Sequence, residues 1–142
     1  MTGLTGADLK GTGVPEMARL LVSLLGAETA AELINHLGGT TFPVSKNKTR
    51  EGRIRHAMLA EVIGERDADL LCAHFGGEKI YIPACRELRQ KRRDKLIRME
   101  FDQLCSTYSG NEAVVVLCGR HRLCDRRIHE ILKQPDTALV AA

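Results

Sequence analysis

The sequence predicts a mainly α-helical fold with short β-strands, in which a duplicated helix-helix-strand unit is followed by a C-terminal helix-turn-helix domain. Three observations support this class. Apolar residues recur at helical spacing along most of the chain, and a helix-helix-Gly-Gly-strand pattern occurs twice. A segment near the C-terminus has the residue order of two helices joined by a tight turn.

The composition indicates a globular protein with one basic half. The 142 residues are 44% hydrophobic and carry a net charge of +3, which supplies a core and excludes a disordered chain. Residues 1–85 hold 9 basic and 10 acidic side chains, whereas residues 86–142 hold 12 basic and 8 acidic ones. The two parts therefore carry −1 and +4. Positive charge concentrated in one half is typical of a nucleic-acid surface.

The cysteine pattern favours reduced thiols. The chain has five cysteines and no Cys-x-x-Cys pair, and no apolar run reaches the roughly 20 residues that span a bilayer. We therefore expect a soluble cytoplasmic protein. A metal-binding regulator using Cys118, His121 and Cys124 is an alternative, although this spacing fits a tetrahedral ion poorly.

Glycine residues mark the predicted ends of the helices in the first half of the chain. Residues 1–13 are rich in Gly and Thr and are expected to be a mobile tail. A first helix should end at Gly26, and a second should cover residues 28–37. Gly38 is expected to end the second helix in a left-handed conformation, and residues 40–44 should form a strand.

The same pattern then repeats. A shift of 38 residues without a gap lays residues 20–44 on residues 58–82, and seven of the 25 pairs are identical. We interpret this as an internal duplication, whose two strands could pair antiparallel about an approximate two-fold axis. The identical pairs are Leu21/Leu59, Gly26/Gly64, Ala30/Ala68, Leu33/Leu71, His36/His74, Gly38/Gly76 and Gly39/Gly77.

The two strands should differ in how many of their edges can form hydrogen bonds, and they should bury the same face of the sheet. Pro43 has no N–H to donate, so the first strand should use only one side for pairing. In the second strand Ile80 and Ile82 should face the core, which leaves Lys79 and Tyr81 on the outside. Lys79 and Tyr81 are therefore candidates for meeting DNA or a partner.

A basic segment connects the two halves. Residues 86–98 carry seven basic side chains and lead into a helix with apolar positions at Ile97, Phe101, Leu104 and Tyr108. Because positive charge at a helix start opposes the macrodipole, we expect a flexible entry that becomes ordered on DNA. The residues of this basic segment that could hold backbone phosphates of DNA are Arg89, Lys91, Arg92, Arg93 and Lys95.

Residues 111–133 have the order of a helix-turn-helix. If Ile128 and Ile131 are the buried positions of the second helix, Leu117 becomes the core residue of the first helix. Asn111 is then expected to cap that first helix. The alternative is that residues 113–117 form a buried strand, since three consecutive valines favour β-structure.

Two positions depart from the usual pattern of this motif. The turn needs a positive φ that Gly adopts freely, and Arg122 at that place should cost about 1 kcal/mol. Cys124 occupies the N-cap of the second helix, where Ser or Thr is usual, and Asp125 is expected to take over part of the capping.

The second helix would present side chains that can reach base edges and phosphates. An arginine can bond a guanine edge twice, and a carboxylate can accept a hydrogen bond from cytosine. The alternative is that these charges form only a solvated face. Candidates for base reading are Arg126, Arg127, His129, Glu130 and Lys133, and candidates for backbone phosphates are Arg120 and Arg122.

At residues 76–83, GGEKIYIP, and in the basic helix and helix-turn-helix that follow, the chain resembles the Mor family, the middle-operon transcription activators of Mu-like phages. The resemblance covers roughly residues 57–133. It implies an N-terminal dimerisation domain, a C-terminal DNA-binding domain, and dimers that act at a promoter with host RNA polymerase. Arg122, Cys124 and the extra copy at residues 20–44 depart from the family pattern, which bears on the site read and on the dimer architecture.

We therefore expect a sequence-specific DNA-binding transcription regulator of a phage or prophage, an activator that acts as a homodimer on double-stranded promoter DNA with bacterial RNA polymerase. We find no residue pattern for catalysis and expect no metal or cofactor. The domains should cover residues 14–84 and 85–134, with a mobile tail at residues 135–142. The alternative is a protein-interaction module that binds RNA polymerase or another regulator and has only non-specific affinity for DNA.

Overall fold

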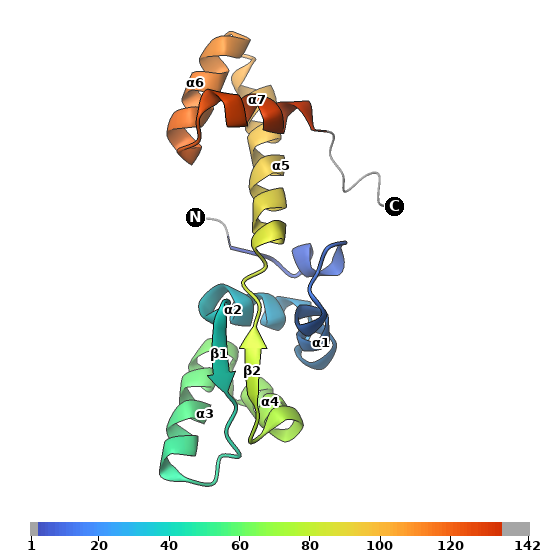
Figure 1. Ribbon diagram of the computed structural model, residues 1–142, viewed down its shortest axis with the longest axis vertical. Coiled ribbons are helices and arrows are strands. Elements are labelled where there is room, and N and C mark those ends of the chain that lie inside the picture. The colour runs from blue at the N-terminus through green and yellow to red at the C-terminus, as the bar shows by residue number, and fades with distance from the viewer. Residues whose placement is uncertain (1–2, 135–142) are drawn as a thin grey trace. The chain divides into compact units, whose positions relative to one another are not determined.

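A computed structural model describes residues 3–134 of the chain. The C-terminal tail predicted at residues 135–142 lies outside the described residues. The chain divides into two compact units, residues 1–89 and residues 90–142, whereas the predicted boundary follows residue 84. The described residues form mainly helices with two short strands, which confirms the predicted fold class (Figure 1). No helix among them is long and apolar enough to cross a lipid bilayer.

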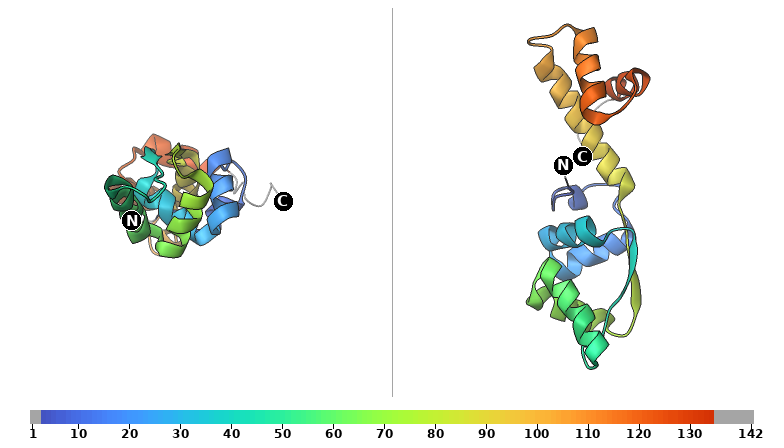
Figure 2. Two further views of the ribbon diagram at one scale, coloured as in Figure 1. Left: turned by 90° about the horizontal axis from the view of Figure 1, so that it is seen from below. Right: turned by 90° about the vertical axis from the view of Figure 1, so that its left-hand side faces the viewer.

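The N-terminal unit packs its helices on one side of a two-stranded antiparallel sheet (Figure 2). Side chains of the sheet alternate between this core and the outside: Ile80 and Ile82 are buried, and Lys79 and Tyr81 are exposed. The elements are the short 3-10 helix η1 (Asp8–Lys10), α1 (Glu16–Leu25), α2 (Ala27–Leu37), β1 (Thr40–Pro43), α3 (Arg50–Ile63), α4 (Glu65–Phe75) and β2 (Lys79–Ile82).

The expectation of a mobile N-terminal tail is wrong for residues 3–13. Leu4 and Leu9 are 4% and 3% exposed and belong to the core of the N-terminal unit. The Leu4 N–H donates to Asn35 Oδ1, and Asn35 Nδ2 donates to the Leu4 carbonyl, both at 2.9 Å. The composition of the segment suggested mobility because of its Gly and Thr content, but burial of its two leucines decides its conformation.

The strand pairing has an internal two-fold relation. Phe42 lies opposite Ile80 at the centre of the ladder. On either side of them, the Gly39 N–H donates to the Ile82 carbonyl at 2.6 Å, and the Gly77 N–H donates to the Val44 carbonyl at 2.8 Å. A shift of 38 residues exchanges these two bonds, because it carries Gly39 to Gly77 and Val44 to Ile82. Both strands therefore find their partner within the same chain.

The helix ends of the two repeats also have matching conformations. Gly26 and Gly64 separate the two helices of each repeat, with φ and ψ of 90° and 156° in one and 89° and 158° in the other. Gly38 does not adopt the left-handed conformation predicted for it, since its φ is −56°. The positive φ falls one residue later, at Gly39 and Gly77, with values of 86° and 89°. The turn thus needs both glycines of each pair.

At Gly38 and Gly76 the requirement for glycine is steric. A Cβ at Gly38 would lie 2.4 Å from the Ile34 carbonyl oxygen, and a Cβ at Gly76 would lie 2.5 Å from that of Cys72. Any side chain at either position would collide with the last turn of its helix.

The C-terminal unit consists of three helices around a small apolar core. They are α5 (Arg86–Leu104), whose first residues belong to the N-terminal unit, α6 (Gly110–His121) and α7 (Asp125–Lys133). Residues 113–117 lie inside α6, so the alternative of a buried strand is wrong. The helix packs because Val114 and Leu117 bury on one face, whereas Val115 is 71% exposed. The core contains Ile97, Val114, Leu117, Ile128 and Ile131.

Helix α5 differs from its prediction at both ends. The basic segment expected to be flexible is a continuous helix from Arg86. Leu88 in its first turn is buried in the core of the N-terminal unit, and this burial fixes the helix start. At the other end α5 stops at Leu104, so Tyr108 lies beyond it in a turn and is 43% exposed.

Candidate nucleic-acid interface

Helices α6 and α7 are joined by a short turn at Arg122. This residue has φ 54° and ψ 46°, the left-handed conformation that the residue order predicts there. The N–H groups of Arg122 and Leu123 both donate to the Cys118 carbonyl, which ends α6. Leu123 then packs against the core that holds Ile128 and Ile131, and this contact fixes α7 against its neighbours.

The start of α6 is capped by Ser109, two residues before the predicted cap Asn111. The Ser109 hydroxyl accepts from the Glu112 N–H at 3.2 Å, and the Glu112 carboxylate accepts from the Ser109 N–H at 3.0 Å. This reciprocal pair is a capping box, and the sequence signal for it was a serine three residues before a glutamate. These bonds hold the pKa of Glu112 below its ordinary value, with the Ser109 N–H as the larger cause.

The start of α7 is capped less completely. Cys124 stands at the N-cap and its side chain makes no capping hydrogen bond. The Asp125 carboxylate accepts from the Arg126 N–H at 2.7 Å, and its negative charge lies at the positive end of the helix dipole. Asp125 thus takes part in capping, as predicted.

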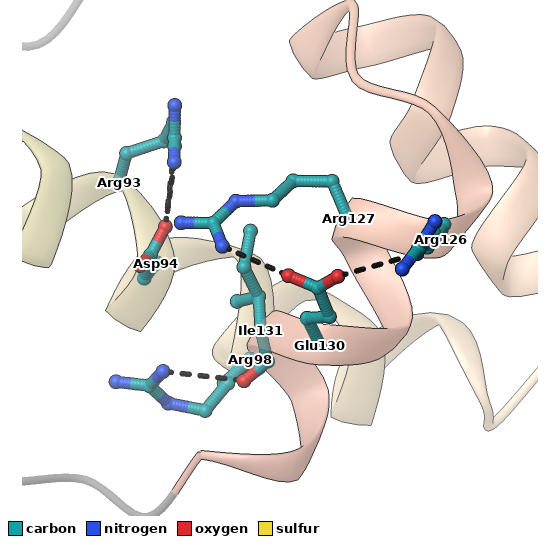
Figure 3. A network of polar contacts seen from close by, with 7 residues as sticks. All are labelled: Arg93, Asp94, Arg98, Arg126, Arg127, Glu130 and Ile131. Carbon is teal, nitrogen blue, oxygen red and sulfur yellow. Dashed lines mark hydrogen bonds and ion pairs between the residues drawn. The ribbon is translucent and has the colours of Figure 1, made fainter.

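The outer face of α7 carries the base-reading candidates. The side chain of Arg126 is 86% exposed, that of Arg127 is 33% exposed, and His129 and Lys133 are exposed. The Glu130 carboxylate lies between the two arginines, 3.6 Å from Arg126 Nε and 3.2 Å from Arg127 Nη1 (Figure 3). Arg126, His129, Glu130 and Lys133 therefore share one exposed surface. The half-buried Arg127 lies at its edge, paired with Glu130.

The basic residues of α5 are used in different ways. Arg93 donates through Nε and Nη2 to Asp94 Oδ1, at 3.2 and 2.9 Å, and Asp94 is 7% exposed (Figure 3). Arg98 donates to the Ile131 carbonyl at 3.4 Å and so ties α5 to the last turn of α7. Lys91 and Lys95 are exposed. The partly buried Arg92 lies on the same helix.

Arg89 differs from the other phosphate candidates. Its Nε donates to the Ala84 carbonyl at 2.9 Å, and its Nη2 donates to the Ile34 carbonyl near the end of α2 at 3.4 Å. The guanidinium is therefore engaged with the main chain of the N-terminal unit. We leave Arg89 out of the DNA-binding surface for this reason.

Glu100 links α5 to the end of α6. Its carboxylate lies 2.6 Å from His121 Nε2 and 3.0 Å from Arg120 Nη1. The His121 side chain is only 14% exposed, whereas that of Arg120 is 51% exposed and can still reach a phosphate. Arg122, the other phosphate candidate of this segment, is exposed at the turn.

One residue of the suggested metal site is hydrogen-bonded to a side chain outside that site. His121 of the set Cys118, His121 and Cys124 is bonded to Glu100. Over residues 3–134, no group of three or more His, Cys, Asp or Glu side chains is arranged to hold a metal ion. Burial raises the pKa of the Cys118 thiol, and the charge of Asp125 raises it further, which disfavours the thiolate that a metal needs.

Asp94, Arg98 and Glu100 contact the candidate site residues or the helices that hold them, and the sequence analysis did not predict these contacts. A signal for Asp94 was present, because Asp94, Ile97 and Phe101 are spaced as one helix face. An acidic residue on an apolar face within a basic run points to an internal partner. No local pattern identified Glu100, whose partners are about 20 residues away in sequence.

Comparison with protein families identifies the family of the chain. The model of the Mor transcription activator family matches residues 35–142, which is more than half of the chain. The chain belongs to the Mor transcription activator family. Searches of curated proteins and of solved structures gave no match.

Membership of the Mor family makes this chain a transcription activator and confirms the resemblance seen in the sequence. The match begins at residue 35, upstream of the segment on which the resemblance rests. Residues 1–34, which contain α1 and most of α2, lie outside it.

Proposed function

We propose that this protein is a sequence-specific DNA-binding activator whose α7 enters the major groove of promoter DNA. The observation that carries the proposal is the exposed face of α7 with Arg126, His129 and Lys133, flanked by the half-buried Arg127. Ile128 and Ile131 fix the helix from behind. Such a helix-turn-helix presents the first turns of its second helix to base edges. Mor family membership supports the same function.

In this proposal Arg126 and Arg127 bond base edges, and His129, Glu130 and Lys133 complete the reading surface. Arg120 and Arg122 contact backbone phosphates near the turn, and Lys91, Arg92, Arg93 and Lys95 do so along α5. The phosphate contacts set the affinity and its salt dependence, whereas the contacts of α7 set the sequence preference.

We further propose a second copy of the chain and bacterial RNA polymerase as partners in a phage or prophage context. A nine-residue helix such as α7 reads few base pairs, and a two-fold dimer doubles the site. Pairing of β1 with β2 leaves one free edge on each strand. The outer face of β2 carries exposed Lys79 and Tyr81, which are candidates for contacting the second copy or DNA. The matching geometry of the two repeats supports an internal duplication as the origin of this arrangement.

The test is selection of binding sites from a pool of random duplexes at about 150 mM salt, where non-specific phosphate contacts are partly screened. The wild-type chain should enrich a two-fold symmetric site with half-sites about one helical turn or a multiple of it apart. Arg126→Ala and Arg127→Ala should abolish the enrichment. A matched control is Arg66→Ala, which removes the same charge from exposed Arg66 on α4.

The competing function is a protein-interaction module with only non-specific DNA affinity. It would give no enriched sequence, and the two α7 variants would weaken binding to all duplexes equally. The exposed surface of α7 would then be examined for binding to purified RNA polymerase.

A further inference from the structure

The N-terminal unit contains a hollow of about 420 Å³ that the proposed function does not use. It lies where the end of β1 and the loop after it meet the first half of α3 and the turn before β2. Four basic side chains line it, against a single acidic one among its lining residues, Glu78. The basic ones are Lys46, Lys48, Arg55 and Lys79.

Arg55 has an unmet hydrogen bond at this hollow. Its Nε is shielded from solvent and has no hydrogen-bond partner among the described residues. Buried donors of this kind are normally paired, and a charged group without its partner is costly to bury. Because this Nε is closed to a water-sized probe, an acceptor in the hollow supplies the missing partner once the Arg55 side chain shifts on binding.

The loop around the hollow is held in one conformation. Thr49 Oγ1 accepts from the Gly52 N–H at 3.0 Å and caps α3, while Ser45 Oγ donates to the Gly52 carbonyl at 2.7 Å. Arg53 Nη2 donates to the Lys48 carbonyl at 3.4 Å, which fixes the loop from the side. The positive end of the α3 dipole therefore adds to the charge of the lysines.

Two glycines stand on the walls of the hollow. A Cβ at Gly77 would lie 2.8 Å from Cε of Lys46, the far end of a flexible side chain that can shift aside. A Cβ at Gly52 would lie 3.0 Å from Thr49 Oγ1 and would crowd the cap. Gly77 also has φ +89°, so any other residue there would strain the backbone.

We propose that this hollow is a binding site for a phosphate group. Four cationic side chains, one of which is Arg55 with its unpaired N–H, and the N-terminus of α3 surround it. Each of these favours a multiply charged anion with several acceptor oxygens. The volume is in the range of pockets that hold small molecules. The same chemistry fits a phosphate of the DNA backbone and a phosphate of a free small molecule, and the experiment separates the two sources.

The test is isothermal titration of the full chain with inorganic pyrophosphate at low ionic strength. We expect saturable binding with one site per chain. Arg55→Gln and Lys48→Gln should each weaken it at least tenfold, and Arg66→Gln, a matched loss of one positive charge on exposed Arg66 of α4, should leave it unchanged. Lys48 is exposed, so its substitution serves even where the Arg55 variant fails to fold.

Binding that does not saturate, or that falls equally in all three variants, would overturn the proposal and would show only diffuse attraction to a basic surface. The source of the phosphate follows from a parallel titration with duplex DNA. A loss of DNA affinity in Lys48→Gln that exceeds the loss in Arg66→Gln assigns the site to the DNA backbone. Unchanged DNA affinity together with lost pyrophosphate binding assigns it to a free phosphorylated molecule. Neither result depends on the role of α7, so the proposed function is tested separately by the binding-site selection.

Discussion

Arg127 and Glu130 form an ion pair on the exposed face of α7, with 3.2 Å between Arg127 Nη1 and Glu130 Oε2. The other oxygen of the same carboxylate lies 3.6 Å from Arg126 Nε. The two donors best placed for a base edge therefore share one acceptor in the free protein. Because Glu130 is exposed and Arg127 is only half-buried, both pairs are in contact with solvent and are weak enough for DNA to displace.

Glu130→Gln should raise the affinity for random duplex DNA. The change removes a negative charge from the surface that faces phosphates and releases the two arginines, so we expect about a threefold gain at low salt that disappears at high salt. Fluorescence anisotropy with a labelled duplex of random sequence measures it. Glu65→Gln, the same charge change at an exposed position of α4, is the control. Equal gains in both variants would contradict a local role for Glu130.

The two repeats predict equal costs for equivalent substitutions. Gly26 and Gly64 both combine φ near 90° with ψ near 157°, which only glycine adopts readily, and no atom lies within 4 Å of a Cβ built at either position. Gly26→Ala and Gly64→Ala should therefore each lower the free energy of unfolding by roughly 1–3 kcal/mol, through backbone strain alone. Urea denaturation followed by circular dichroism measures both. A large cost at one glycine and none at the other would show that the repeats are not equivalent.

Much of the fold could be predicted from local patterns. The positions of Ile128, Ile131 and Leu117 followed from helical spacing, and the structure buries all three. The left-handed turn at Arg122 followed from the residue order of the motif, even though arginine gives no sign of it by itself. Spacing and order are local properties, so the sequence carries them directly.

What the sequence did not reveal depends on contacts between distant segments. The burial of Leu4 requires Asn35, which lies 31 residues later and accepts its N–H. In the sequence, Arg89 is one of several cations in a basic segment. Its contact with the Ile34 carbonyl forms only when the chain folds. The pairing of Glu100 with His121 likewise exists only when α5 and α6 pack together. The sequence therefore shows which residues are candidates for the site, but it does not show which of them are already paired within the fold.

The start of α6 should depend on pH. Hydrogen bonds from Ser109 lower the pKa of Glu112 in the folded protein, so its contribution to stability is complete above the ordinary pKa of glutamate and is lost as the pH falls through the lowered value. Carbon NMR of the Glu112 carboxyl group should show a depressed pKa in the wild-type chain. Ser109→Ala should raise this pKa only in part, because alanine keeps the backbone N–H that is the larger cause of the depression. A pKa of Glu112 at its ordinary value in the wild-type chain would show that the capping box does not form in solution.

The thiols should differ in their rates of alkylation. Burial raises the pKa of the Cys85 thiol, although the nearby Arg89 opposes this, and Cys85 is 6% exposed. Cys105 and Cys124 are exposed. Because the thiolate is the reactive form, iodoacetamide at neutral pH should label these two at least about tenfold faster than Cys85. Peptide mass spectrometry of timed samples measures the order. Early labelling of Cys85 would mean that the start of α5 opens in solution.

Arg122→Gly should separate stability from DNA binding at one residue. Arg122 has φ 54°, a conformation that glycine adopts without the strain of a Cβ, so the variant should be more stable by about 0.5–1 kcal/mol. The same change removes a candidate phosphate contact, so affinity for DNA should fall and the slope of log affinity against log salt should decrease by about 1. Denaturation and anisotropy titrations over a range of salt measure the two effects.

Arg122→Ala is the control, because it removes the charge and keeps the strained conformation: it should lose the same affinity for DNA without gaining stability. If Arg122→Gly gains stability and binds DNA as well as the wild-type chain, the turn has the predicted geometry but lies away from the phosphates. The reading surface would then have to be placed further along α7, toward His129 and Lys133.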